Sequence, residues 1–295
     1  MTPERESKSQ GVAIVNAGGG NSNAVAAELF ERVPTLRVIE VEHPHLLRRT
    51  VRAAVVDGAP FVAAIGGDGT LRTTAEVLLG STTALVPVPG GTRNHFATQV
   101  GLESVDRVVE AISSGVITKI DVGDMSGHVF LNNVVAGWYP AMVRRRERLQ
   151  RLLPKRIANL VAIAIELPRR QRLEVTVNGE HITTWMLFVG NGIYGLSLNE
   201  IAEREGLREG VLDVRVLRAE GVLAKLRAAF VLLTARVDRS PTLVRLVAPS
   251  VLVSTRPRAI DVTLDGELTG VRGPLEFSIR RGALAIQRPV DAPVP

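Results

Sequence analysis

Cysteine is absent from the 295-residue sequence, which excludes a disulfide framework and any catalytic thiolate. Aromatic residues make up only 4% of the chain, and none of them interleaves with a basic cluster. A stacking platform for single-stranded nucleic acid needs such interleaving, so we expect no nucleic-acid partner. No apolar run approaches the roughly 20 residues that span a bilayer, and residues 1–10 lack the apolar core of a signal peptide. These absences favour a cytoplasmic protein.

Positive charge is in excess, with a formal net charge of +6 at pH 7. This balance favours anionic partners such as nucleotides and acidic lipid surfaces. The excess is concentrated in residues 144–156, RRRERLQRLLPKR, where seven Arg or Lys stand against a single acid, Glu147. Leucines in the same segment make it amphipathic, which suits peripheral contact with the anionic inner face of a membrane. A solvated helix face is an equally weighted interpretation.

Two different patterns divide the chain. The first part alternates short apolar runs with helical segments, which is typical of a parallel sheet with helices on both faces; the expected strands are 12–15, 36–41, 61–65 and 84–88. After about Asp121, short strand-like runs are separated by Gly, Asn-Gly and Asp-Gly turns, which indicates an antiparallel sandwich or barrel. Two helical stretches, 141–167 and 222–237, interrupt it. We predict an α/β domain over residues 1–122 and a β-sandwich domain over residues 123–280.

The segment Gly66-Gly67-Asp68-Gly69-Thr70 follows a buried strand and opens a helix. Glycines there let the backbone approach a phosphate group and present N–H groups to it. Asp68 places a carboxylate beside that site, able to hold a metal ion or polarise a hydroxyl, and Thr70 can cap the helix or contact a phosphate oxygen. An ordinary strand–helix turn is the alternative. Three glycines, one acid and one threonine at the end of a strand favour a phosphate-binding loop.

Two further loops lie at the carboxyl ends of expected strands, where open α/β sheets bind ligands. The loop after strand 84–88 would, alone, be interpreted as a Pro-Gly turn. The loop after strand 12–15 lacks the Gly-Lys-Ser/Thr ending of a Walker A motif and the spacing of a dinucleotide fingerprint. Together with 66–70 they predict a nucleotide site, and its further candidate residues are Asn16, Gly18, Gly19, Gly20, Gly91, Thr92 and Asn94.

A late acidic turn reads Leu264-Asp265-Gly266-Glu267. Asp-Gly is a common hairpin turn, and a hairpin alone is the simpler interpretation. A carboxylate here can instead act as general base for an acceptor hydroxyl. Asp265 and Glu267 are therefore candidate catalytic residues beside Asp68.

The segments 66–70, 91–94, 209–213 and 265–267 together resemble the lipid kinase family that includes bacterial diacylglycerol kinases. That family shares its catalytic domain with sphingosine and ceramide kinases, and the resemblance runs from Val12 to about Pro289. It implies an ATP-binding α/β domain of the NAD-kinase and diacylglycerol-kinase type, and a β-sandwich domain for the lipid substrate. It also implies that residues 281–295 return to the first domain.

The resemblance further implies ATP and Mg²⁺ as cofactors and assigns roles to residues. Asp68 would help to organise magnesium and the nucleotide phosphates, and Glu267 would be the general base. Glu209, with carbonyls near Gly206 and Val211, would hold a structural magnesium ion. Close relatives usually show Asp-Asp-Gly where this chain has Arg208-Glu209-Gly210.

The implied reaction is transfer of the γ-phosphoryl group of ATP to the hydroxyl of diacylglycerol or a related lipid. Two alternatives stay open: an NAD kinase-like enzyme, which shares the GGDGT loop, and a nucleotide- or lipid-binding regulator without catalysis. A lipid substrate is the expected partner, and a homodimer is compatible with the sequence.

Overall fold

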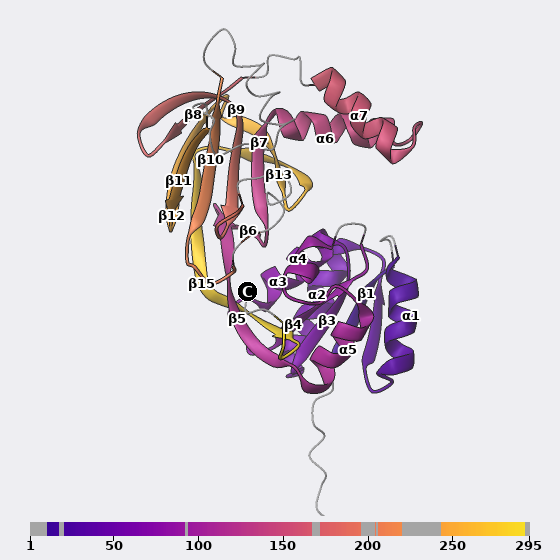
Figure 1. The fold of residues 1–295 in the computed structure, drawn as a ribbon. Coiled ribbons are helices and arrows are strands. Elements are labelled where there is room, and N and C mark those ends of the chain that lie inside the picture. Colours follow the sequence, from indigo (N-terminus) through magenta and orange to yellow (C-terminus); the bar gives the residue numbers. More distant parts are fainter. Residues whose placement is uncertain are drawn as a thin grey trace, which may run out of the picture. The chain divides into compact units, whose positions relative to one another are not determined.

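The computed structural model describes residues 11–17, 21–91, 94–166, 172–195, 204, 206–219 and 243–292. The chain divides into two compact units (Figure 1). Unit 1 comprises residues 1–122 and 281–295, and unit 2 comprises residues 123–280. The chain leaves unit 1 within β5 (Val116–Met125) and returns to it within β15 (Leu275–Arg288).

Unit 1 is built on a parallel sheet with the strand order β15-β4-β3-β1-β2. Its central strand β3 reads FVAAIG and is buried at every residue, as expected for a strand covered on both faces. The elements are β1 (Val12–Asn16), α1 (Ser22–Arg32), β2 (Arg37–Val41), α2 (Pro44–Val56), β3 (Phe61–Gly66), α3 (Asp68–Leu78), β4 (Ala84–Pro89), α4 (His95–Gln99) and α5 (Val105–Ser114).

The strand order explains which helices cover which face. The chain steps from β1 to β2 in one direction along the sheet, then returns past β1 to β3 and continues to β4. Right-handed crossovers therefore place α1 on one face and both α2 and α3 on the other. In agreement, α2 packs against α3, and α1 packs against α5.

The C-terminal segment is tied into unit 1 by polar contacts. The Gly282 N–H donates to Asp121 Oδ1 at 2.7 Å, and the Gln287 side-chain amide donates to the Ala111 carbonyl at 2.7 Å. Arg288 is buried and donates from Nε to Thr118 Oγ1 at 3.0 Å and from Nη1 to the Ala292 carbonyl at 2.6 Å. The final strand is thus an integral part of the first sheet.

Unit 2 is an antiparallel β structure around a large apolar core. Strand β12 alternates exposed and buried residues along SVLVSTR, the pattern of a sheet with one face on a core. Besides parts of β5 and β15, the unit contains β6 (His128–Phe130), β7 (Asn133–Gly137), β8 (Leu173–Val177), β9 (Glu180–Asn191), β10 (Leu212–Arg218), β11 (Leu243–Ala248), β12 (Ser250–Arg256), β13 (Ala259–Leu264) and β14 (Glu267–Arg272). The predicted fold class, an α/β domain followed by an antiparallel β domain, is confirmed.

The helical stretch expected at 141–167 forms two helices, α6 (Trp138–Leu149) and α7 (Lys155–Glu166). The break falls just before Pro154, which has no N–H to donate within a helix and ends the preceding turn. The stretch expected at 222–237 lies outside the described residues. No helix of the described ranges is long and apolar enough to cross a membrane.

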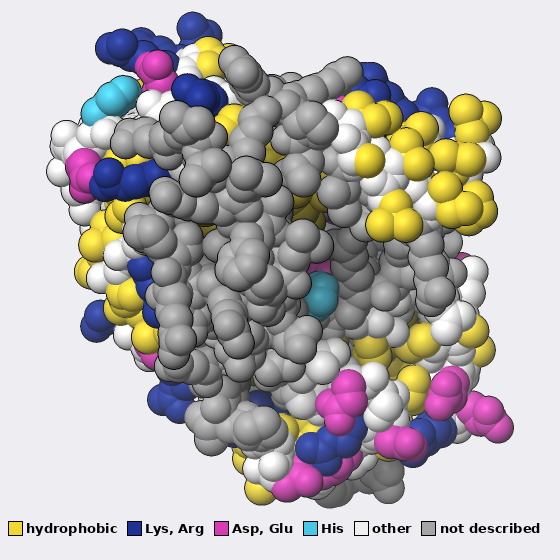
Figure 2. All heavy atoms as spheres, turned by 45° about the horizontal axis from the view of Figure 1, so that its top comes forward, with side chains coloured by type: hydrophobic (Ala, Val, Ile, Leu, Met, Phe, Trp, Pro, Cys, Tyr) yellow, Lys and Arg dark blue, Asp and Glu magenta, His cyan; other side chains and the backbone are white. Residues whose placement is uncertain are grey.

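Helices α6 and α7 pack on each other through Met142, Val143 and Ala162. The opposite side of α7 leaves Ile157 and Leu160 exposed by 49% and 67%, and Leu152 before it is exposed by 85%. Figure 2 shows hydrophobic side chains gathered at the upper right, over these helices, with basic side chains beside them. This end of unit 2 therefore presents an apolar face next to positive charge.

Candidate active site

Three loops meet at the carboxyl edge of the parallel sheet in unit 1. Strands β4, β3 and β1 are neighbours, so their carboxyl ends at Pro89, Gly66 and Asn16 lie side by side. The strand order reverses between β1 and β3, and open α/β sheets bind ligands at this switch point. The side-chain amide of Asn16 donates to Thr70 Oγ1 at 2.8 Å, which ties the first loop to the GGDGT segment.

The loops after β3 and β4 touch each other through their backbones. The Gly90 N–H donates to the Gly66 carbonyl at 3.3 Å. A Cβ atom at Gly91 would lie 2.6 Å from the Cα of Gly67, so no side chain fits there. Asn94 has a left-handed backbone, and its side chain accepts from the Gly91 N–H at 2.8 Å and donates to the Gly91 carbonyl at 3.0 Å. Packing thus requires glycine at positions 90 and 91, and Asn94 shapes the second loop.

Asp68 begins α3 and is half-buried. The N–H groups of Thr70 and Leu71 both donate to the Gly67 carbonyl, at 2.9 and 3.1 Å, which closes the first turn. No side chain of the described residues caps this helix end, and the N-terminus of a helix carries partial positive charge that favours anions. The predicted residues Asn16, Gly66–Thr70, Gly91 and Asn94 therefore share one edge of unit 1. Gly18, Gly19, Gly20 and Thr92 lie outside the described residues.

In unit 2, the Asp-Gly pair forms a two-residue hairpin between β13 and β14. Asp265 and Gly266 both have positive φ, at 49° and 86°, which is the geometry of a type I′ turn. Leu264 pairs with Glu267, the exposed first residue of β14. The turn thus fixes the position of Glu267 at the start of β14.

The Asp265 side chain is buried and accepts three backbone hydrogen bonds. Its donors are the N–H groups of Leu131, Asn132 and Asn133, at 2.8, 2.7 and 3.1 Å. The Asp265 N–H in turn donates to the Asn133 carbonyl at 2.9 Å. These contacts give Asp265 a structural role in holding the segment 131–133; its catalytic role, like that of Glu267, stays a prediction.

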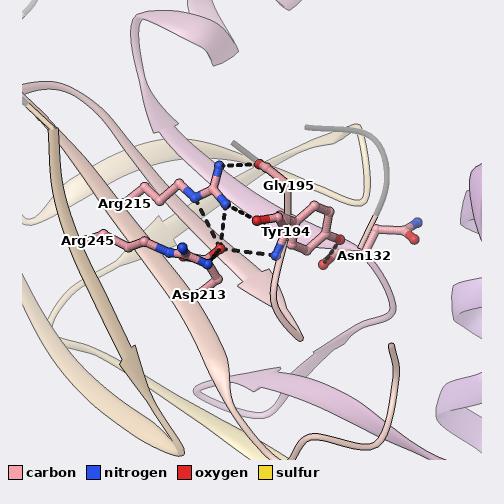
Figure 3. A network of polar contacts seen from close by, with 6 residues as sticks. All are labelled: Asn132, Tyr194, Gly195, Asp213, Arg215 and Arg245. Carbon is pink, nitrogen blue, oxygen red and sulfur yellow. Dashed lines mark hydrogen bonds and ion pairs between the residues drawn. The ribbon is translucent and has the colours of Figure 1, made fainter. Parts of the chain in front are cut away.

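A second buried carboxylate, Asp213 on β10, lies at the centre of the network in Figure 3. Arg215 Nη2 donates to its Oδ2 at 2.6 Å, Arg245 donates to both oxygens at 2.9 and 3.0 Å, and the Tyr194 N–H donates at 3.1 Å. Burial opposes ionisation of Asp213, but the hydrogen bonds from Arg215 and Arg245 outweigh it, and the pKa of the carboxyl lies below its usual value. Asp213 therefore stays charged and joins β10 and β11 to the backbone at Tyr194.

Asp213 lies in segment 209–213 of the family resemblance, but its ion-pair partners Arg215 and Arg245 were not predicted from the sequence. A signal for Arg215 was present, because residues two apart on a strand share a face and a buried strand with Asp and Arg at this spacing suggests an ion pair. Arg245 had no such signal. It reaches Asp213 only because β11 pairs with β10 in a register that sets Arg245 opposite Arg215.

The residues expected to hold a structural magnesium ion are partly brought together. A Cβ at Gly192 would lie 2.5 Å from the Gly206 carbonyl and 3.2 Å from Glu209 Oε2, so both oxygens approach this glycine. The Val211 carbonyl accepts from the Gly192 N–H at 3.0 Å. Among the described residues, no three His, Cys, Asp or Glu side chains group in a way that could hold a metal ion.

Gly91→Ala should lower the stability of unit 1, because its methyl group collides with the backbone of Gly67. Overpacking of this kind typically costs about 1–3 kcal/mol. Gly270→Ala is the control, since the nearest atom to its added Cβ would be 3.9 Å away. Calorimetric unfolding of both variants measures the difference, and equal melting temperatures would contradict the tight contact between the two loops.

Asp213→Asn should destabilise the protein by about 3–5 kcal/mol at neutral pH, because it leaves Arg215 and Arg245 without their counter-charge. A carboxyl with a lowered folded pKa contributes stability above its unfolded pKa of about 3.9 and loses it as pH falls through the folded value. The difference in unfolding free energy between wild type and variant should therefore shrink below about pH 4. Denaturant unfolding across pH measures it.

The control for Asp213→Asn is Glu180→Gln, which breaks the exposed pair with Arg218. Exposed pairs contribute about 0–1 kcal/mol, so this variant should unfold almost like the wild type. A pH-independent loss in Asp213→Asn would show that its carboxyl is not charged in the folded state.

Comparison with known proteins identifies the family. The family model described as the diacylglycerol kinase catalytic domain matches residues 10–125. A Pseudomonas fluorescens protein named "Probable lipid kinase YegS-like" is 30% identical over 261 residues, which cover 84% of this chain and 83% of that protein. A protein of the same name from Pseudomonas savastanoi is 30% identical over 259 residues, covering 84% and 82% of the two chains.

Solved structures agree at the level of the fold. The structure of a candidate diacylglycerol kinase from Bacillus anthracis superposes with a TM-score of 0.74 at 18% identity, covering 98% of this chain and 100% of that chain. The glycine loops of unit 1, the order of an α/β unit before an antiparallel one, and the similarity along most of the chain lead to one conclusion. The chain belongs to the bacterial YegS-like lipid kinases, which carry the diacylglycerol kinase catalytic domain.

Proposed function

We propose that unit 1 binds ATP along its three carboxyl-edge loops and that unit 2 binds the lipid. The enzyme is an ATP-dependent lipid kinase, a phosphotransferase with an alcohol acceptor, and we propose diacylglycerol or a related lipid as the acceptor. The observation that supports ATP binding in unit 1 is the meeting of Asn16 and Gly66–Thr70 with Gly90, Gly91 and Asn94 at the switch point of the sheet. Backbone packed this closely lets N–H groups, and not side chains, face a phosphate.

In the proposed reaction, the lipid hydroxyl oxygen forms a bond to the γ-phosphorus of ATP while the bond to the bridging oxygen breaks, leaving ADP. Glu267 accepts the proton of the hydroxyl. Asp68 would hold Mg²⁺ together with the ATP phosphates, where the ion would neutralise charge on the transferred group. This assignment fits the residues present, since Mg²⁺ in kinases is usually bound by one or two carboxylates plus substrate phosphates.

No finding favours the two alternatives. An NAD kinase-like enzyme would share the GGDGT loop, but the similarity to lipid kinases extends through both units. A regulator without catalysis would have no need of both carboxylates, and Asp68 and Glu267 are both present.

Two single substitutions test the proposed roles. Asp68→Asn should reduce turnover on the order of 100-fold or more, because it removes the charge proposed to organise magnesium and phosphate. Glu267→Gln should reduce turnover by roughly 10²–10⁴-fold, the usual contribution of a general base, with the affinity for ATP unchanged. Transfer of labelled phosphate to detergent-dispersed diacylglycerol gives turnover, and calorimetric titration gives ATP affinity.

Matched controls are Asp57→Asn in unit 1 and Glu174→Gln in unit 2, both exposed acids outside the proposed site. Normal turnover in Asp68→Asn would refute its role. Loss of ATP affinity in Glu267→Gln, with turnover of the bound nucleotide retained, would refute the proton-accepting role of Glu267.

We also propose that the α6–α7 end of unit 2 contacts an anionic membrane surface. Only some of the basic residues in segment 144–156 are available for this contact. Arg144 pairs with Asp261, and Arg145 pairs with the buried Glu166. Arg148 and Arg151 are exposed, close in sequence to the exposed apolar residues Leu152, Ile157 and Leu160. An apolar face flanked by cations favours an anionic bilayer, because burial of the side chains and attraction of the charges act together.

Leu152→Ser with Leu160→Ser should weaken binding to vesicles rich in phosphatidylglycerol at least tenfold. Full burial of a leucine side chain contributes about 1.5–3 kcal/mol to the free energy of binding, and partial insertion into the bilayer contributes a fraction of that value. Arg148→Gln with Arg151→Gln should weaken binding at low salt and lose its effect at high salt. Vesicle sedimentation measures both effects, and turnover of detergent-dispersed lipid should change little.

Val56→Ser in unit 1 is the control, since Val56 is as exposed as Leu152, at 85%. Unchanged vesicle binding in both double variants would refute the docking surface. Equal losses on vesicles and on dispersed lipid would place these side chains at the substrate site instead. A cytoplasmic location at the inner membrane face is part of this proposal, and the homodimer stays a prediction.

A further inference from the structure

Arg204 lies in unit 2 as a cation surrounded by oxygen atoms. Its Nη1 donates to the Leu131 carbonyl at 2.6 Å and to the Asn191 carbonyl at 2.9 Å. Its Nη2 lies 3.4 Å from Asn132 Oδ1. The guanidinium carbon stands 5.9 Å from the centre of the Tyr194 ring. A carbonyl-lined position of this kind favours positive charge.

Two carboxylates act on the same cation. Burial lowers the pKa of Arg204, while the neighbouring Tyr194, Asp265 and Glu209 act against that shift. Asp265 and Glu209 are therefore close enough to stabilise the guanidinium charge. These carboxylates belong to the hairpin turn before β14 and to the turn before β10.

The segment 131–133 is held from both sides. Its N–H groups donate to Asp265, whereas the Leu131 carbonyl accepts from both Arg204 and Asn191 Nδ2, the latter at 3.0 Å. The Asn132 carbonyl accepts from the Tyr194 hydroxyl at 2.8 Å. Asp265 is two residues before Glu267 and fixes the hairpin from which Glu267 extends. Loss of the cation would thus loosen the segment that anchors this hairpin.

We propose that Arg204 is a positioning residue for Glu267, and that its guanidinium supplies internally the positive charge that a structural magnesium ion would bring to the Glu209 turn. The positioning part rests on the proposed role of Glu267 as general base. The charge part does not depend on Glu267, because it rests on the carbonyl contacts of Arg204 and on the approach of Arg204 and Glu209 to the same glycine, Gly192.

The described residues around the Glu209 turn do not fit a magnesium ion. Magnesium requires near-octahedral coordination by oxygen atoms, and here one carboxylate and the Gly206 carbonyl approach Gly192 while the Val211 carbonyl already accepts a hydrogen bond. The Arg204 Cδ would lie 3.7 Å from a Cβ at Gly192, so its positive side chain approaches the same glycine. A second cation there would be repelled by the first.

The first test compares melting temperatures of ATP-free wild type in millimolar magnesium and in chelator. We expect equal values, because the internal cation is permanently present. A melting temperature that rises with magnesium in wild type, and no longer does so in Glu209→Gln, would overturn the proposal.

The second test uses Arg204→Met, Arg204→Lys and the exposed control Arg258→Met. Hydrogen exchange at the amides of residues 131–133 should be at least tenfold faster in Arg204→Met and intermediate in Arg204→Lys, which keeps the charge but not the planar fork. The kcat should fall roughly 10- to 100-fold with the KM for ATP unchanged, as for a displaced catalytic group. Unchanged exchange and kcat would overturn the proposal. Should Arg204→Met not fold, Arg204→Lys and the wild-type magnesium comparison decide it.

The double variant Arg204→Met/Glu267→Gln separates this proposal from the proposed function. If Arg204 acts through Glu267, the double variant should be no slower than Glu267→Gln alone. An active Glu267→Gln would refute the base assignment, whereas the exchange and magnesium readouts would still test Arg204. Additive losses in the double variant would overturn the positioning role.

Discussion

The candidate nucleotide site depends on one close contact between backbones. Where the loops after β3 and β4 meet, a Cβ at Gly91 would lie 2.6 Å from the Gly67 Cα, and a Cβ at Gly90 would lie 2.9 Å from the Gly66 nitrogen. This contact brings the ends of two neighbouring strands within hydrogen-bonding distance and leaves Asp68 at the start of α3. Glycine at these positions therefore serves packing, and in the proposed ATP site it would also let a phosphate approach the backbone. A side chain at Gly91 would separate the loops.

Two turns of unit 2 depend instead on buried carboxylates. Asp213 and Asp265 are both buried carboxylates, but their partners differ. Asp213 is held by two guanidinium groups, whereas Asp265 accepts from three consecutive backbone N–H groups. A buried carboxylate is expensive unless all of its acceptor capacity is used. In both cases a buried negative charge holds distant backbone segments together. The Asp265 hairpin is also the one that precedes the proposed base, Glu267.

The contrast between these rigid turns and the α6–α7 end fits a division of tasks within a lipid kinase. Catalysis requires closely positioned groups, and the anchored hairpin before β14 would hold the proposed base Glu267 in this way. The proposed contact with a lipid surface requires exposed apolar area, which Leu152, Ile157 and Leu160 provide, and positive charge, which Arg148 and Arg151 provide. Pairing of Arg144 and Arg145 with carboxylates shows that a run of basic residues in the sequence is not a uniform basic surface in the fold.

The sequence by itself determined those features that depend on neighbouring residues. The continuous apolar run of β3, the glycine motif after it and the Asp-Gly hairpin could be predicted, because burial on both faces, φ freedom and turn geometry are local properties. The break between α6 and α7 is also local, and Pro154 signalled it although the stretch was expected to be one helix. Strand β11 was not expected, since its residues are only partly buried and give no clear alternation.

Only the tertiary structure decided the contacts that join distant segments. Strand β15 continues through Arg280 and Arg281 to pair with β4, where the sequence pattern suggests a strand ending near Ile279. Asp265 meets residues 131–133, more than 130 positions earlier, and Arg204 meets the same segment from the other side. No periodicity or propensity encodes such pairs, because they arise from strand order and register. The chemical types at the candidate site were therefore visible in the sequence, whereas their anchoring was a property of the fold alone.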